Sequence, residues 1–321
     1  MSGSNFPSGF AGGVTIRGVP IDIPHPGEVF WVNNSSVLAK GAVGGSNGND
    51  GSYRRPFQTI EYAIGKCTAD RGDVIYVMPG HSEACASAAA IDFDVAGVTL
   101  IGLGTGSKQA QIRLTAAAAN INIDAANITW INMRVTAAFA DVAAAIDILA
   151  TGDNFSSINC VYDEEAADEN YIVVFAVTDG ANGGHFEGNQ YWGGDVANDS
   201  FWVGAGTHTR TSFINNTFNH AAVQTGVVAF ITSATAFTLG RIIGNNFANQ
   251  QPVAAASCVV LTGTGNTGIC DNNVINFLDT DATNANCISA FDVTGMGMGR
   301  AQASGAVDET ANIFSRSTLT S

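Results

Sequence analysis

Two pairs of aspartates are the candidates for the carboxyl groups of a glycosidase. A glycosidase needs two carboxyl groups about 5 to 10 Å apart, and the sequence offers Asp163 with Asp195 and Asp279 with Asp281. Asp163 and Asp195 lie at different offsets from the nearest copy of a repeated asparagine motif, so they are not equivalent positions. Asp279 and Asp281 follow the last copy of that motif. Neither pair predicts a catalytic site.

Other residues that could do chemistry are equally dispersed. Arg210, Arg241 and Arg300 do not lie near an acidic pair, as a lyase would require. The histidines are scattered and the serines lack a nucleophile-elbow motif. The glycines at 102–106 imitate a dinucleotide-binding turn, but the residues that follow read as a strand. We therefore expect no catalysis, no metal ion and no cofactor.

Three aromatic residues leave two interpretations open. Tyr191, Trp192 and Trp202 could form a platform on which sugar rings stack. They could equally cap the ends of coils or line a contact between subunits.

An asparagine recurs at a nearly constant interval through the chain. It holds the fourth position of a six-residue motif that begins and ends with an apolar residue, as in Phe186-Glu-Gly-Asn189-Gln-Tyr191. The steps from a weaker copy at Asn132 onward are 27, 30, 27, 29 and 27 residues, through Asn159, Asn189, Asn216, Asn245 and Asn272. A period of about 20 to 50 residues indicates a solenoid. Short apolar runs split by Asn and Gly argue against helical repeats.

Asparagine suits a sharp turn between strands because it adopts the left-handed αL conformation more readily than other non-glycine residues. One such turn per coil would align the side-chain amides so that each bonds to the next. The sequence therefore predicts an all-β fold, a right-handed single-stranded parallel β-helix. Its predicted ladder consists of Asn159, Asn189, Asn216, Asn245 and Asn272.

Composition agrees with stacked coils and limits the partners. Glycine contributes 37 of 321 residues and charged residues only 13%, which suits tight turns and an apolar interior. The net charge of −15 argues against nucleic acid as a partner, because phosphate binding needs basic patches. No apolar run reaches the roughly 18 residues of a membrane span. We expect no membrane, no signal peptide and six reduced, structural cysteines.

The chain divides into three predicted segments. Residues 1–52 form a Gly-, Pro- and Asn-rich arm without periodicity, which can become ordered against a partner. Residues 53–293 form the β-helix, beginning with a short helix at about 56–66 that covers the open end of the first coil. Residues 294–321 form a tail or a terminal cap.

The entry into the predicted solenoid resembles that of pectate-lyase-like β-helix proteins. The resemblance is carried by Gly48-Asn-Asp-Gly51, by Arg55-Pro-Phe-Gln-Thr-Ile-Glu-Tyr-Ala-Ile64 and by residues 72–83. Residues 5–20 are similar to the opening of virion proteins of tailed bacteriophages, among them β-helix proteins that decorate the capsid. The resemblance implies a trimeric knob with its N-terminal part toward the shell. The fold itself hosts lyases, hydrolases, adhesins and structural proteins, so it does not settle function.

We therefore expect a structural virion protein, a capsid decoration (cement or head-knob) protein of a tailed bacteriophage. It would be made in the host cytoplasm and reside on the capsid surface, with the major capsid protein and further copies of itself, as a homotrimer, for partners. Two alternatives stay open: a tail spike or fibre that binds or depolymerises a host surface polysaccharide, and a host-encoded β-helix lyase. The residues expected to attach the chain to the capsid are Phe6, Phe10, Ile16, Arg17, Phe30 and Trp31.

Overall fold

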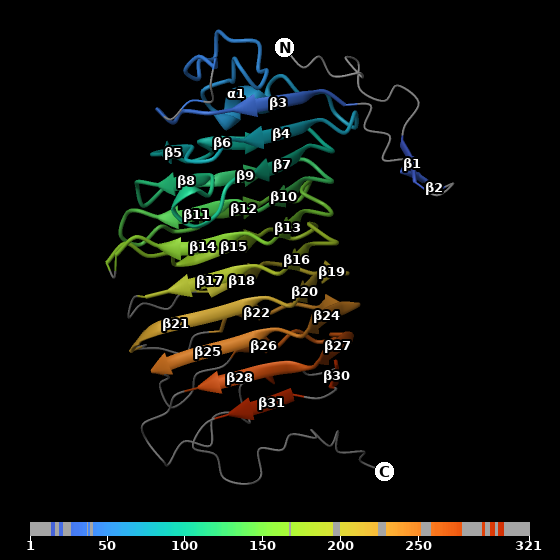
Figure 1. Ribbon diagram of the computed structural model, residues 1–321. Helices are drawn as coiled ribbons and strands as arrows, with labels where there is room; N and C mark the ends of the chain where they lie inside the picture. The colour runs from blue at the N-terminus through green and yellow to red at the C-terminus, as the bar shows by residue number, and fades with distance from the viewer. Residues whose placement is uncertain are drawn as a thin grey trace, which may run out of the picture.

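The computed structural model is a parallel β-solenoid (Figure 1). The structure describes residues 14–16, 19–21, 27–36, 38, 41–166, 168–194, 200–223, 229–251, 258–277, 291–292, 296–298 and 301–304. Three strands make up each coil, and equivalent strands of successive coils stack into three parallel sheets. The predicted all-β solenoid with almost no helix is confirmed, while its handedness stays a prediction.

Each sheet takes one strand from every coil. The first sheet contains β3 (Val29–Val32), β4 (Val74–Val77), β7 (Thr99–Gly102), β10 (Thr129–Ile131), β13 (Ser156–Ile158), β16 (His185–Glu187), β20 (Ser212–Ile214), β24 (Gly240–Ile243), β27 (Gly268–Asp271) and β30 (Gly297–Met298). The second contains β5 (Ser82–Cys85), β8 (Gln111–Leu114), β11 (Arg134–Ala137), β14 (Val161–Glu164), β17 (Gln190–Gly193), β21 (Thr217–Val223), β25 (Asn246–Gln251), β28 (Asn273–Phe277) and β31 (Ala301–Ser304). The third contains β6 (Ile91–Phe93), β9 (Ile121–Ile123), β12 (Ile146–Ile148), β15 (Val173–Val177), β18 (Ser200–Gly204), β22 (Ile231–Ser233), β26 (Val259–Leu261) and β29 (Phe291–Asp292). Two small pairs complete the strands, namely β19 (His208–Thr209) with β23 (Phe237–Thr238), and the antiparallel β1 (Val14–Ile16) with β2 (Val19–Ile21).

The core is built from rows of identical or similar side chains, because parallel strands in register place equivalent residues above one another. Phe186 pairs with Phe213 in the first sheet, and their rings stack 5.0 Å apart at 9°. In the second sheet Phe218 pairs with Phe247, with rings 4.9 Å apart at 15°. All four side chains are fully buried. Successive strand residues point to opposite faces, so alternate rows point outward.

From β10 to β24, the strands of the first sheet are short because left-handed residues stand at both of their ends. All of these residues have φ between +53° and +77°. The leading row is Gly72, Gly97, Asn127, Asn154, Gly183, Arg210 and Leu239, and the trailing row is Asn132, Asn159, Gly188, Asn215, Gly244 and Asn272. Glycine and asparagine dominate both rows because αL conformations are unfavourable for other L-residues.

A ladder of buried asparagines follows the trailing row by one residue. Its members are Asn189, Asn216, Asn245 and Asn273. The Nδ2 group of each donates to Oδ1 of the next, at 3.1, 2.9 and 3.0 Å. Asn245 Nδ2 also donates to the Phe213 carbonyl, and Asn245 Oδ1 accepts the Asn216 backbone N–H, each at 2.9 Å. The ladder therefore satisfies backbone groups that turn inward at this corner.

The predicted ladder mixed two adjacent rows. Asn189, Asn216 and Asn245 belong to the observed ladder. Asn159 and Asn272 instead occupy the trailing left-handed row, because Asn159 is in register with Gly188 and Asn272 with Gly244. Asparagine is favoured in both rows for different reasons, so the motif alone did not separate them.

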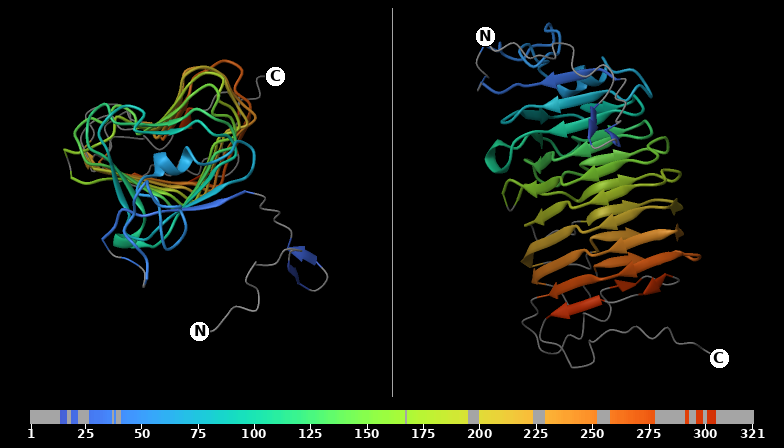
Figure 2. Two further views of the ribbon diagram at one scale, coloured as in Figure 1. Left: turned by 90° about the horizontal axis from the view of Figure 1, so that it is seen from above. Right: turned by 45° about the vertical axis from the view of Figure 1, so that its right-hand side comes forward.

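A short helix lies over the interior at the N-terminal end of the solenoid (Figure 2). This helix, α1 (Ile60–Ile64), buries Ile60, Ala63 and Ile64. Glu83 points inward from β5, and its carboxylate accepts the Ile60 backbone N–H at 2.9 Å. The helix is present within the predicted range, and its role as a cap stays a prediction.

The solenoid begins earlier than residue 53, the boundary expected from the sequence. Strand β3 pairs in parallel with β4 and is the first strand of the first sheet. Phe30 and Val32 point into the core, where the Phe30 and Phe57 rings lie 5.7 Å apart. This strand is not evident from the repeat, because a long connection separates it from β4.

The ladder predicts a large difference between two neighbouring asparagines. Asn245 is buried, whereas Asn246 is exposed on β25. Replacing Asn245 with Ala removes the hydrogen-bond partner of buried groups of Asn216, Asn273 and Phe213. Each unsatisfied buried group costs about 1–3 kcal/mol. We expect Asn245→Ala to lower the free energy of unfolding by about 3 kcal/mol or more, measured by urea denaturation.

The matched control is Asn246→Ala, for which a change within about 0.5 kcal/mol is expected, as for most surface substitutions. Equal losses in the two variants would contradict the ladder.

Candidate functional site

The outer face of the second sheet carries a polar network on β11 and β14. Arg134 Nε lies 2.9 Å from Asp163 Oδ2, and Thr136 Oγ1 donates to Asp163 Oδ1 at 2.7 Å. The hydrogen bond to Asp163 raises the pKa of Arg134 further above its usual value. Asp163, considered as a catalytic carboxylate, is therefore engaged in an ion pair. Its proposed partner Asp195 lies outside the described residues, as do Asp279 and Asp281.

The outer face of the third sheet is acidic toward the N-terminal end. Asp92, Asn122 and Asp147 are in register on β6, β9 and β12 and point outward. Burial raises the pKa of both Asp92 and Asp147. Glu61 of α1 accepts the Asp92 backbone N–H at 2.7 Å, which adds a third carboxylate to the same area.

The outer face of the first sheet instead carries an apolar row. The row begins where Trp31 pairs with Tyr76, their rings stacked 4.8 Å apart at 24°. It continues in register through the next three strands, and every member is partly exposed. We call this row the apolar stripe: Trp31, Tyr76, Ile101, Ile131 and Ile158. The exposed Tyr53 ring packs edge-on against Trp31 at 5.0 Å.

The stripe ends at β16, where Glu187 occupies the same row. Ile214 and Ile243 follow in the next two coils, and Asp271 comes after them. From Ile131 onward, every position of this row is the residue just before the trailing left-handed residue. The sequence therefore contains a signal for the outward row. It can be used only when it is known which asparagines are left-handed and which belong to the buried ladder.

The residues expected to attach the chain to a capsid are placed differently from one another. Phe6, Phe10 and Arg17 lie outside the described residues, and Ile16 belongs to β1. Phe30 is a core residue with 8% exposure, which leaves little of its side chain for contact with a capsid. Trp31 points outward and opens the apolar stripe.

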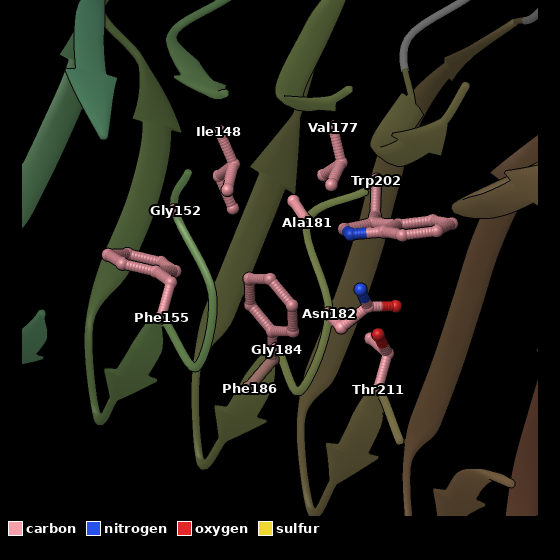
Figure 3. Close-up of a pocket in the computed structure, with 10 residues that line it drawn as sticks. All are labelled: Ile148, Gly152, Phe155, Val177, Ala181, Asn182, Gly184, Phe186, Trp202 and Thr211. Atoms are coloured by element: carbon pink, nitrogen blue, oxygen red, sulfur yellow. The ribbon is translucent and has the colours of Figure 1, made fainter. Parts of the chain in front are cut away.

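The three aromatic residues considered as a sugar platform do not share a surface. Tyr191 and Trp202 are buried, whereas Trp192 is 46% exposed on β17. Trp202 lines a small cavity of about 10 Å³ together with Phe155 and Phe186 (Figure 3). That volume holds at most about one water molecule, so the cavity cannot take a sugar ring.

The described residues show few other features of a binding site. No group of three His, Cys, Asp or Glu side chains there is arranged to hold a metal ion. The glycine-rich corner at 102–106 leads into one turn of 3₁₀ helix, η1 (Gly106–Lys108), and then β8, as the sequence indicated. Within the same part of the chain, no helix is long and apolar enough to cross a membrane. Cys67, Cys85, Cys160 and Cys270 are free thiols.

Comparison with known proteins adds no assignment. No family model, no curated protein and no solved structure matches the chain. The apolar stripe is therefore a candidate site on geometric and chemical grounds.

Asp92 gives a pH-dependent prediction about the acidic face. Burial, followed by the charges of Asp94 and Asp124, raises the pKa of Asp92, and its buried Oδ1 has no hydrogen-bond partner in the described chain. A raised pKa means that the folded state binds the proton more tightly. This carboxyl therefore favours folding below pH about 3.9, and that contribution is lost as the pH rises through the folded-state pKa. We expect Asp92→Asn to raise the urea midpoint at pH 7 but not at about pH 3.

The control is Asp50→Asn. Hydrogen bonds from Ser52, together with the charge of Arg55, lower the pKa of Asp50, so its replacement should bring no gain at pH 7. A gain for Asp92→Asn that persists unchanged at low pH would contradict the explanation.

Proposed function

We propose that the protein is a structural virion protein of a tailed bacteriophage, a homotrimeric capsid decoration protein of the pectate-lyase-like β-helix type. The observation that carries the proposal is the apolar stripe, which runs along a rigid body from the strand nearest the N-terminal residues. The resemblance of residues 5–20 to the opening of phage virion proteins, which rests on the sequence alone, points to the same role. The solenoid would be the projecting body and the N-terminal residues the attachment to the major capsid protein.

A second copy of the chain is the occupant that best fits the stripe. Neighbouring strands lie about 4.8 Å apart, so the five side chains of the stripe span about 19 Å at a fixed spacing. A second copy carries the same side chains at the same spacing, which allows the two rows to match coil by coil. The chain has a net charge of −15, so copies that approach through the acidic third sheet would repel each other. A closed ring of three would bury the stripe of each copy.

The N-terminal residues suit attachment to a different protein. The segment before β3 holds Phe6, Phe10 and Arg17 and few acids, unlike the acidic body. Apolar groups spaced along a segment that lacks a core of its own bury little surface until a partner orders them. Trp31 belongs to β3, and the rings of Tyr76 and Tyr53 pack against it, so the attachment would adjoin the subunit contact.

Self-association is tested by placing a charge in the stripe. Ile131→Glu would bring like charges together around the axis of a trimer without touching the core. We expect the wild-type chain to show three times its 33.1 kDa mass in native mass spectrometry, and the variant to be monomeric.

Gln190→Glu is the control, because Gln190 is exposed on the outer face of the second sheet. It adds the same charge and should remain trimeric. A wild-type chain that stays monomeric at micromolar concentration would rule out the homotrimer.

Attachment is tested with a variant that lacks residues 1–26 but keeps β3. We expect it to fold and trimerise like the full chain, yet fail to bind capsids from which the protein has been stripped, in a co-sedimentation assay. Equal binding of the truncated and full chains would show that residues 1–26 do not attach the protein. A tail spike would instead be present in a handful of copies, so the number of chains per purified virion distinguishes the two locations.

A further inference from the structure

A serine, a histidine and a glutamate form a hydrogen-bonded chain just beyond the apolar stripe. His185 and Glu187 are on the outward face of β16, and Ser212 is the register partner of His185 on β20. The strands β16 and β20 lie side by side (Figure 1). Ser212 Oγ lies 2.8 Å from His185 Nδ1, and His185 Nε2 lies 2.9 Å from Glu187 Oε2. Both distances are within the range that connects a nucleophile, a base and an orienting acid in hydrolases.

The partners favour one arrangement of the hydrogens. An ionised carboxylate can only accept, so His185 Nε2 carries the hydrogen and donates it to Glu187. Nδ1 of the neutral ring is then an acceptor for the Ser212 hydroxyl. The other acceptor near Ser212 Oγ is the Gly184 carbonyl, at the longer distance of 3.5 Å. The two ring nitrogens are exchanged relative to the serine protease arrangement, but such triads are recognised by roles and geometry.

We propose that Ser212 is a nucleophile that cleaves carboxylic esters of small acyl groups, with His185 as its base and Glu187 as the positioning residue. Ser212 Oγ attacks the ester carbonyl carbon while its proton moves to His185 Nδ1. The bond to the alcohol oxygen then breaks, and His185 returns the proton to that oxygen. A water molecule hydrolyses the acyl-serine by the same route, which releases the carboxylic acid and restores Ser212.

The surroundings of Ser212 fit a small acyl group. Arg241 is the register partner of Ser212 in the next coil, about 4.8 Å along the sheet, and is exposed. Its guanidinium can face the oxyanion that forms during the attack, which is the kind of stabilisation acyl transfer requires. Ile214 lies on the same face two residues after Ser212 and gives an apolar neighbour for a methyl group. Ser212 is only 7% exposed, which disfavours bulky acyl groups.

Covalent labelling tests the nucleophile directly. The full chain is treated with a small alkyl fluorophosphonate, and the modified residue is located by peptide mass spectrometry. We expect the label on Ser212, no label at this position in Ser212→Ala, and labelling at least about 100-fold slower in His185→Gln, because a general base contributes roughly 10²–10⁴-fold. His185→Gln changes a partly exposed side chain, and an unchanged urea midpoint shows that it is folded.

Ser156 supplies the matched control. Ser156 lies in the same row one coil before His185, and Ser212 lies one coil after it, so both serines are register partners of His185. His185 Nδ1, however, bonds to Ser212. Ser156→Ala should label like the wild type and should also hydrolyse p-nitrophenyl acetate at the wild-type rate, whereas Ser212→Ala should not. In Glu187→Gln, labelling should slow and its dependence on pH should shift, which a purely structural residue would not cause.

Failure to label Ser212 in the folded wild-type chain would overturn the proposal, as would equal labelling of the wild type and His185→Gln. Neither result bears on the capsid role, which depends on the stripe and the N-terminal residues.

Discussion

Each coil must turn its backbone sharply at the ends of the first sheet without leaving buried polar groups unpaired. The left-handed residues make the turn, and their backbone N–H groups still donate to the next coil, as Asn215 does to the Ile243 carbonyl. Arg210 and Leu239 adopt the same conformation, although αL is unfavourable by about 1–2 kcal/mol for such residues. The geometry of the turn therefore prevails over local preference. The buried asparagines then pair the backbone groups that face inward.

The ladder also fixes the direction of every neighbouring side chain. Because strand residues alternate between faces, a one-residue slip would exchange the interior for the exterior. With Asn245 inward, Phe247 two residues later also faces the core. Before the left-handed turn at Gly244, Ile242 is buried and Ile243 faces outward. The trailing row adds a steric constraint, since a Cβ atom on Gly244 would lie 2.4 Å from Asn215 Oδ1. Glycine at that position leaves room for the asparagine one coil earlier.

The repeat period was sufficient to predict the solenoid, because a constant interval between asparagines reports the length of one coil. It was not sufficient to show which asparagine of a coil is left-handed and which belongs to the buried ladder. Asn215–Asn216 and Asn272–Asn273 place asparagine in both rows. Without that distinction, the sequence did not show that Tyr191 and Trp202 are buried or that Ile131 and Ile158 face outward. Strand β3 was missed because it precedes the first repeat. His185 and Ser212 are 27 residues apart, so only the register of adjacent coils reveals that they meet.

The outer face of the first sheet carries two kinds of surface, the apolar stripe and the polar residues around Ser212. They occupy successive coils along the sheet. The apolar stripe ends at Ile158, one coil before His185 and Glu187. A subunit contact confined to the stripe would thus leave Arg241 exposed and the surface around the buried Ser212 free of the partner copy. Both surfaces are rows of outward side chains, whereas the ladder and the aromatic stacks that hold the coils together are inward rows. Substitutions in the outward rows therefore change association or reactivity while the interior that maintains the fold stays intact.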